Sequence, residues 1–188
     1  MWSCEQNAVL SRFLRLAAAM ALAGAVGGCF QPIYADRSPT GGPGVRDMLA
    51  QVEIPPISAP QGISIARVAV EVQNELRFNL TGGGGAPAPT HKLIVRLAGS
   101  NSAVIIDRNT ARAEFSTYGL TATYQLIEIA TNRQVMSAES TARATYDIPG
   151  QEQRFAAARG FKDAESRAVK VIADMIKTRL ASYFTAGT

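Results

Sequence analysis

Three stretches of the chain alternate apolar and polar side chains with a period of two, in residues 93–97, 120–126 and 136–146. Strict alternation puts one set of side chains on each face of a strand, so the pattern predicts a sheet with one packed face and one wet face. The apolar run 104–106 is expected to extend the first stretch. No helical pattern separates the three stretches, and turns at 107–109 and 131–133 join them.

Helical periodicity flanks these strands on both sides. Apolar residues spaced by three and four predict a helix over 65–80, which the glycines at 82–85 end. A longer helix is expected over 151–183. The apolar stripe of the first helix comprises Ile65, Val68, Ala69, Val72, Leu76 and Leu80. The stripe of the second comprises Ala164, Ala168, Val171, Ile172, Met175, Ile176, Leu180 and Tyr183.

The element order favours one α+β domain over residues 48–188. Residues 48–54 are strand-like and stop at two prolines, so the expected order is strand, helix, three strands and helix. Each helix must bury its stripe. Two helices packed on one face of a four-stranded mixed sheet would bury both stripes.

The N-terminal segment has the features of an export signal. Arg12 and Arg15 precede an apolar run over 16–26, which is too short to cross a bilayer. Residues 26–29, Val-Gly-Gly-Cys, resemble the lipobox of bacterial lipoproteins, in which the cysteine becomes the first mature residue and carries acyl chains. The resemblance implies a signal peptide over 1–28, lipidation of Cys29 and a tether over 29–47.

Two further points concern this segment. Phe30 follows the cysteine where an aspartate would hold such a lipoprotein at the inner membrane, so the resemblance implies the outer membrane.

The alternative is a buried amphipathic N-terminal helix in which Cys29 is an ordinary thiol. Residues 16–28 contain no charged or strongly polar side chain that would form a solvated face, which favours the signal.

Composition and motifs argue against several functional classes. The net charge is +4, or +3 without residues 1–28, and no Lys/Arg run marks a nucleic-acid binder. Without Cys4 and with Cys29 acylated, no thiol remains for catalysis or metal binding. His91 is the single histidine, and neither a Gly-x-Ser-x-Gly nor a His-Glu-x-x-His motif occurs. The sequence therefore predicts a non-enzymatic protein without metal or cofactor.

The layout resembles the lipopolysaccharide-assembly lipoprotein family, LptE. The resemblance begins at 28–34, Gly-Cys-Phe-Gln-Pro-Ile-Tyr, just after the expected lipidation site. It continues through 108–115, where an Arg-Asn turn precedes Ala-Glu-Phe, and ends with 162–168 in the last helix. It implies a small domain that sits as a plug in the β-barrel LptD, assists the assembly of the barrel and contacts lipopolysaccharide at the outer membrane.

The resemblance also implies that basic side chains at the tip of the sheet contact the lipopolysaccharide. Arg108 matches the family's turn arginine, and Arg159 is the looser match in the last helix, since Gly160 follows it where the family often has an acid. A guanidinium suits phosphate recognition, although an arginine on a turn is most often simply solvated. Further basic candidates are Lys92, Arg96, Arg112 and Arg143.

Two other functions stay open at this point. One is an auxiliary lipoprotein of a lipid-transport ABC system, since such proteins are also small, α/β and lipid-anchored. The other is a lipid-anchored periplasmic hydrolase, for which the sequence offers no catalytic motif.

Overall fold

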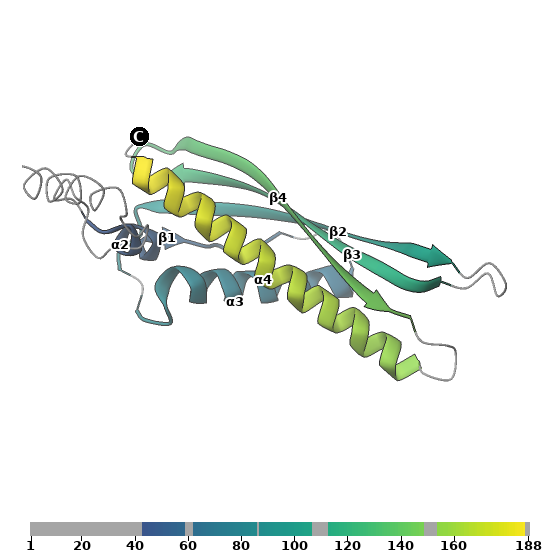
Figure 1. Ribbon diagram of the computed structural model, residues 1–188. Helices are drawn as coiled ribbons and strands as arrows, with labels where there is room; N and C mark the ends of the chain where they lie inside the picture. The colour runs from purple at the N-terminus through teal and green to yellow at the C-terminus, as the bar shows by residue number, and fades with distance from the viewer. Residues whose placement is uncertain (1–42, 59–61, 86, 107–112, 149–153, 187–188) are drawn as a thin grey trace, which may run out of the picture.

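The computed structural model describes residues 43–58, 62–85, 87–106, 113–148 and 154–186. The sheet order is β1-β2-β3-β4, with β1 parallel to β2 and the other neighbours antiparallel, and two long helices pack against it (Figure 1). The predicted α+β fold is therefore confirmed. The elements are α2 (Val45–Ala50), β1 (Val52–Glu53), α3 (Ile63–Thr81), β2 (His91–Ile106), β3 (Ala113–Glu128), β4 (Arg133–Asp147) and α4 (Arg154–Ala186).

The segment before the first long helix differs from the predicted strand over 48–54. Its first part belongs to the helix α2, where Leu49 is 2% exposed and the helix packs against α3 and α4. Strand β1 keeps only two residues. Pro55 and Pro56 follow shortly and have no N–H group to donate to a sheet ladder, which interrupts the strand. The chain meets β2 again at a single bridge between Ser58 and Arg96.

The core lies between the sheet and the two long helices. Strand β3 contributes Leu120, Tyr124 and Leu126, each 1% exposed or less. The predicted stripe of α3 is buried from Val68 to Leu80. The predicted end of this helix is also confirmed, because Gly82 takes the left-handed conformation at φ 66° and donates to the Phe78 carbonyl at 2.8 Å.

The predicted stripe of α4 is wrong at two positions. Val171 and Met175 are 48% and 43% exposed, whereas Val169 and Ala173 are buried. The reason is that α4 packs against α3 as well as against β3 and β4, so its buried sector turns toward α3. Val171 and Met175 are left beside the edge of the sheet at β4.

A carboxylate joins the two long helices inside the protein. Glu165 on α4 is fully buried, and its Oε1 accepts a hydrogen bond from the Ser64 hydroxyl at 2.7 Å. Its Oε2 accepts from the Arg67 guanidinium, which is 41% exposed. A buried charge is stable only when it is paired and hydrogen-bonded, so this contact fixes the start of α3 against α4.

We expect His91 to make the stability of the fold depend on pH. Its ring lies edge-on to Phe184 with centroids 5.2 Å apart, and burial lowers its pKa below 6.5, more than Glu128 raises it. The unfolded chain therefore takes up the proton first as the pH falls, so the fold loses stability below about pH 6.5. The urea concentration at the midpoint of unfolding should fall between about pH 7.5 and 5.5 in both proteins. The fall should be smaller in His91→Gln than in the parent chain. An equal drop in both proteins would contradict the assignment.

Candidate functional site

One face of the sheet is left open, because both long helices pack on the other (Figure 1). Strand residues with buried side chains, such as Leu93 in β2 and Leu120 in β3, point toward the helices. The alternate residues point the other way. The open face therefore carries Lys92 and Arg96 from β2 and Arg143 from β4, and the last two are exposed.

Threonines hold the middle of this open face together. The hydroxyls of Thr117 and Thr145 lie 3.2 Å apart across β3 and β4, and those of Thr121 and Thr141 lie 3.1 Å apart. Such cross-strand pairs stabilise a wet face without burying apolar area. The surface is thus polar and able to form hydrogen bonds. The predicted alternation placed Thr121, Thr141 and Thr145 on the wet face without singling them out, and Thr117 lies before the predicted stretch 120–126.

The candidate Arg159 lies at one end of the sheet. It is exposed on α4, and the residues beside it pack on the end of β4 through the Phe161 ring, whose centroid is 5.6 Å from those of both Tyr118 and Tyr146. Figure 1 shows that α4 begins at the end of the sheet where β2 finishes and β3 starts. The aromatic contacts therefore place this part of α4 beside the end of β4 and beside Tyr118, which pairs with Asn101 five residues before the end of β2.

The candidates Arg108 and Arg112 lie outside the described residues. They belong to segment 107–112, which connects Ile106 at the end of β2 with Ala113 at the start of β3. Cys29, in the N-terminal segment 1–42, also lies outside the described residues.

Lys92 and Arg96 are far from this end. Lys92 pairs with Ile127 near the end of β3, and Arg96 pairs with Thr123. Strand β2 has 16 residues, so at about 3.3 Å per residue its two ends are about 50 Å apart. Of the basic candidates that the structure describes, Lys92 and Arg96 lie toward the start of β2, and Arg143 pairs with Gly119 nearer the middle of the sheet. Arg159 stands on α4.

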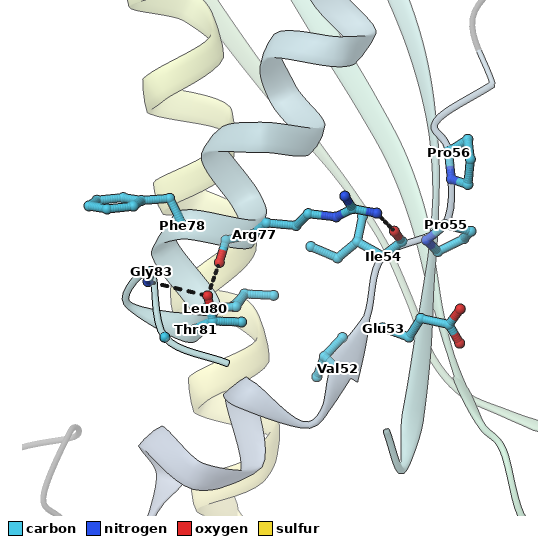
Figure 2. Close-up of a pocket in the computed structure, with 11 residues that line it drawn as sticks. Val52, Glu53, Ile54, Pro55, Pro56, Arg77, Phe78, Leu80, Thr81 and Gly83 are labelled. Atoms are coloured by element: carbon cyan, nitrogen blue, oxygen red, sulfur yellow. Dashed lines mark hydrogen bonds between the residues drawn. The ribbon is translucent and has the colours of Figure 1, made fainter. Parts of the chain in front are cut away.

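A groove of about 630 Å³ lies between β1 and the last turns of α3 (Figure 2). Figure 2 shows Arg77 reaching across toward Ile54, and its Nη2 donates to the Ile54 carbonyl at 3.1 Å. The Phe78 ring points the other way and is 63% exposed. Arg77 thus ties the segment after β1 to α3.

The histidine and a serine hydroxyl of the described residues are both engaged in local contacts. Nδ1 of His91 lies 2.9 Å from the Thr90 hydroxyl, and the Ser64 hydroxyl is engaged by buried Glu165. Within the described ranges, no group of three His, Cys, Asp or Glu side chains that could hold a metal ion is found. Among the helices in those ranges, none is long and apolar enough to cross a membrane.

Comparison with solved structures finds lipoproteins with a similar fold. A lipoprotein from Caulobacter crescentus CB15 is 22% identical, with a TM-score of 0.58 over 77% of this chain and 97% of the other. The rare lipoprotein B from Shewanella oneidensis is 12% identical, with a TM-score of 0.52 over 72% and 96%. Lipoprotein B from Nitrosomonas europaea is 14% identical, with a TM-score of 0.53 over 72% and 84%. These likenesses concern the fold alone. A search of curated sequences finds no match.

The chain thus has the α+β fold of these solved structures, and one polar face of its sheet is left open. The profile of the family described as "LptE: Lipopolysaccharide-assembly" matches residues 49–180, from α2 to the last turns of α4. The chain is a lipoprotein of the LptE lipopolysaccharide-assembly family. This family is not enzymatic, which confirms the prediction made from the motifs.

Proposed function

We propose that this protein is an outer-membrane subunit of the lipopolysaccharide translocon that is held by acyl chains on Cys29, assists assembly of an LptD-like β-barrel as its plug, and binds lipopolysaccharide. The family match over residues 49–180 is the observation that carries the proposal. The lipobox at 26–29 and Phe30 support the anchor and its membrane. Two or more acyl chains make such an anchor effectively stable.

The proposed lipopolysaccharide contact is the end of the sheet where β2 and β3 are joined. Arg108 and Arg112 belong to the segment between β2 and β3, and Arg159 is exposed on α4. Lipid A and its core are polyanionic, and guanidinium groups form bidentate hydrogen bonds to phosphate. Lys92 and Arg96 stay weaker candidates, because the length of β2 separates Lys92 from this end.

Replacing Arg108 with glutamate is expected to weaken lipopolysaccharide binding about three- to tenfold, since one charge-assisted contact becomes a repulsion. The affinity of the purified full chain for lipopolysaccharide measures the effect. Arg133→Glu is the matched control, because Arg133 is exposed at the β3–β4 turn, at the other end of the sheet. Equal affinities of the two variants would contradict the role of Arg108.

The partner is tested by capturing the full chain from detergent-solubilised membranes and identifying what stays bound. The proposal expects an outer-membrane β-barrel of the LptD kind in stoichiometric amount. Recovery of an ABC transporter component in its place would instead support an auxiliary role in lipid transport and contradict the proposal.

A further inference from the structure

Strand β4 has an outer side on which no other strand of the described residues pairs. It ends the sheet order β1-β2-β3-β4, its 15 residues include neither proline nor glycine, and its register against β3 is regular from Met136 to Asp147. Proteins normally shorten, interrupt or cover such an edge, because its free N–H and C=O groups are a template for a further strand. The opposite edge is short, since β1 has two residues. The described fold therefore leaves one long edge that can accept an extended chain.

Contacts with α4 show which backbone groups of β4 point outward. The Thr145 carbonyl accepts a hydrogen bond from Nη2 of Arg167 at 2.8 Å. The Asp147 carbonyl lies 3.5 Å from where a β-carbon on Gly160 would stand. Both residues are odd-numbered, and in an antiparallel strand the N–H and C=O of one residue point to the same side. The odd-numbered residues from 139 to 143 therefore direct their backbone groups away from β3.

The side chains on this edge define the charges of a segment that fits it. Glu139 and Arg143 are exposed on the open face of the sheet, and Thr141 lies between them. Opposite charges that face each other on neighbouring strands stabilise a sheet, whereas like charges destabilise it. A strand added to β4 is therefore expected to place a basic residue opposite Glu139 and an acidic residue opposite Arg143.

A groove on the helix side of the same edge favours apolar side chains. It has a volume of about 770 Å³ and lies between β4 and α4, where its lining includes Ala138, Val171 and Met175. Val171 and Met175 are 48% and 43% exposed, although they lie on the face of α4 predicted to be buried. Successive side chains of a strand point to opposite faces, so every second side chain of an added strand would lie beside this groove. The edge thus fits a segment in which apolar and charged residues alternate.

We propose that β4 accepts an extended segment of the LptD-like β-barrel partner as an added strand along residues 139–143. The inference rests on the proposed function, in which a single copy of this chain is the plug of that barrel. Strands in a barrel wall already pair with one another, so the segment that reaches β4 is a connecting segment that enters the lumen. Its backbone binds the outward N–H and C=O groups, and its alternating side chains meet the groove and the two charges. Arg167 occupies the Thr145 carbonyl and limits the pairing at that end.

Backbone hydrogen exchange tests the added strand directly. The full chain is compared in detergent, alone and in its complex with the barrel. Amides of residues 139, 141 and 143 should exchange at least about tenfold more slowly in the complex, because their N–H groups become hydrogen-bonded there. Residues 130–132 of the β3–β4 turn are the control, since the proposal places no pairing there. Unchanged exchange at 139–143 in a complex that contains the barrel would overturn the proposal.

A proline on the edge removes one outward donor and leaves the ladder between β4 and β3 in place. Thr141→Pro should therefore capture about tenfold less barrel from detergent-solubilised membranes than the parent chain. Thr141→Ala is the matched control, because it keeps the N–H group and should capture as much barrel as the parent. Urea unfolding shows whether both variants are folded. Equal capture by a folded Thr141→Pro variant would overturn the added strand alone, whereas no capture by the parent chain would overturn the proposed function and the added strand with it.

Exchanging the two charges tests the side-chain pairing and does not rely on proline. The double variant E139R/R143E keeps the net charge of the chain but reverses its pattern along the edge. It should weaken capture of the barrel about two- to tenfold, because two opposite-charge pairs become like-charge pairs. Capture equal to that of the parent chain would contradict the proposed charges of the added strand.

Discussion

Replacing Glu165 with alanine is expected to lower the free energy of unfolding by about 2 to 4 kcal/mol, from loss of a buried ion pair and the cavity left behind. Glu165 is fully buried, and its carboxylate accepts hydrogen bonds from Ser64 and Arg67 on α3. Arg67 is 41% exposed, so water can solvate it after the change. The expected loss of unfolding free energy is therefore smaller than for a pair with both charges fully buried. Removing one partner of such a pair costs about 3 to 5 kcal/mol.

Urea unfolding of the full chain measures this change, and Asp163→Ala is its matched control. Asp163 accepts from Nε of Arg167 at 2.7 Å one turn along the same helix, but its side chain is 67% exposed. Exposed pairs of this spacing contribute about 0.2 to 0.5 kcal/mol. A loss for Glu165→Ala no larger than that for Asp163→Ala would contradict the structural role of Glu165.

Replacing Cys29 with serine is expected to abolish lipidation and to move nearly all of the protein out of the membrane fraction. The expectation follows from the lipobox at 26–29, because serine has no thiol to accept an acyl chain. Each buried CH₂ contributes about 0.8 kcal/mol, so the loss of two or more chains removes the anchor entirely. Metabolic labelling with palmitate, followed by fractionation of the cells, measures both effects.

Cys4→Ser is the matched control for this change. Cys4 precedes the expected cleavage point, so this variant should keep both the label and the membrane location of the parent chain. Palmitate retained in Cys29→Ser, or lost equally from both variants, would show that Cys29 is not the lipidation site.

Periodicity predicted most of the fold because it reports directly on burial. The alternation around Leu93, Leu120 and Ala142 identified three strands and the face that packs on the helices. The run 104–106 was correctly assigned to the first strand across the polar interval that contains Gly99 and Ser102. Such patterns predict burial correctly where each face of an element meets a single environment, either the core or solvent.

The errors occurred where an element meets two neighbours or is very short. Val171 and Met175 fit an apolar stripe, but α4 divides its contacts between the sheet and α3 and leaves them exposed. Residues 48–50 look strand-like, yet they belong to a helix of six residues, and Leu49 is buried there. Both outcomes depend on tertiary packing, which outweighs local propensity.

The candidate site was less accessible to sequence reasoning than the fold. The family resemblance selected Arg108 and Arg159, and the fold adds that Lys92 stands near the opposite end of β2. Nothing in the local sequence distinguishes Glu165 from a solvated helix residue, because its partner Arg67 lies 98 positions earlier. The outward direction of the β4 backbone likewise became visible only through its contacts with α4.

Depletion of the protein in growing cells, followed by detection of lipopolysaccharide at the cell surface, tests the central claim most directly. If the chain is a working subunit of the lipopolysaccharide translocon, newly made lipopolysaccharide should stop reaching the surface and the LptD-like barrel should fail to mature. Undiminished surface lipopolysaccharide together with a normally assembled barrel would contradict the account.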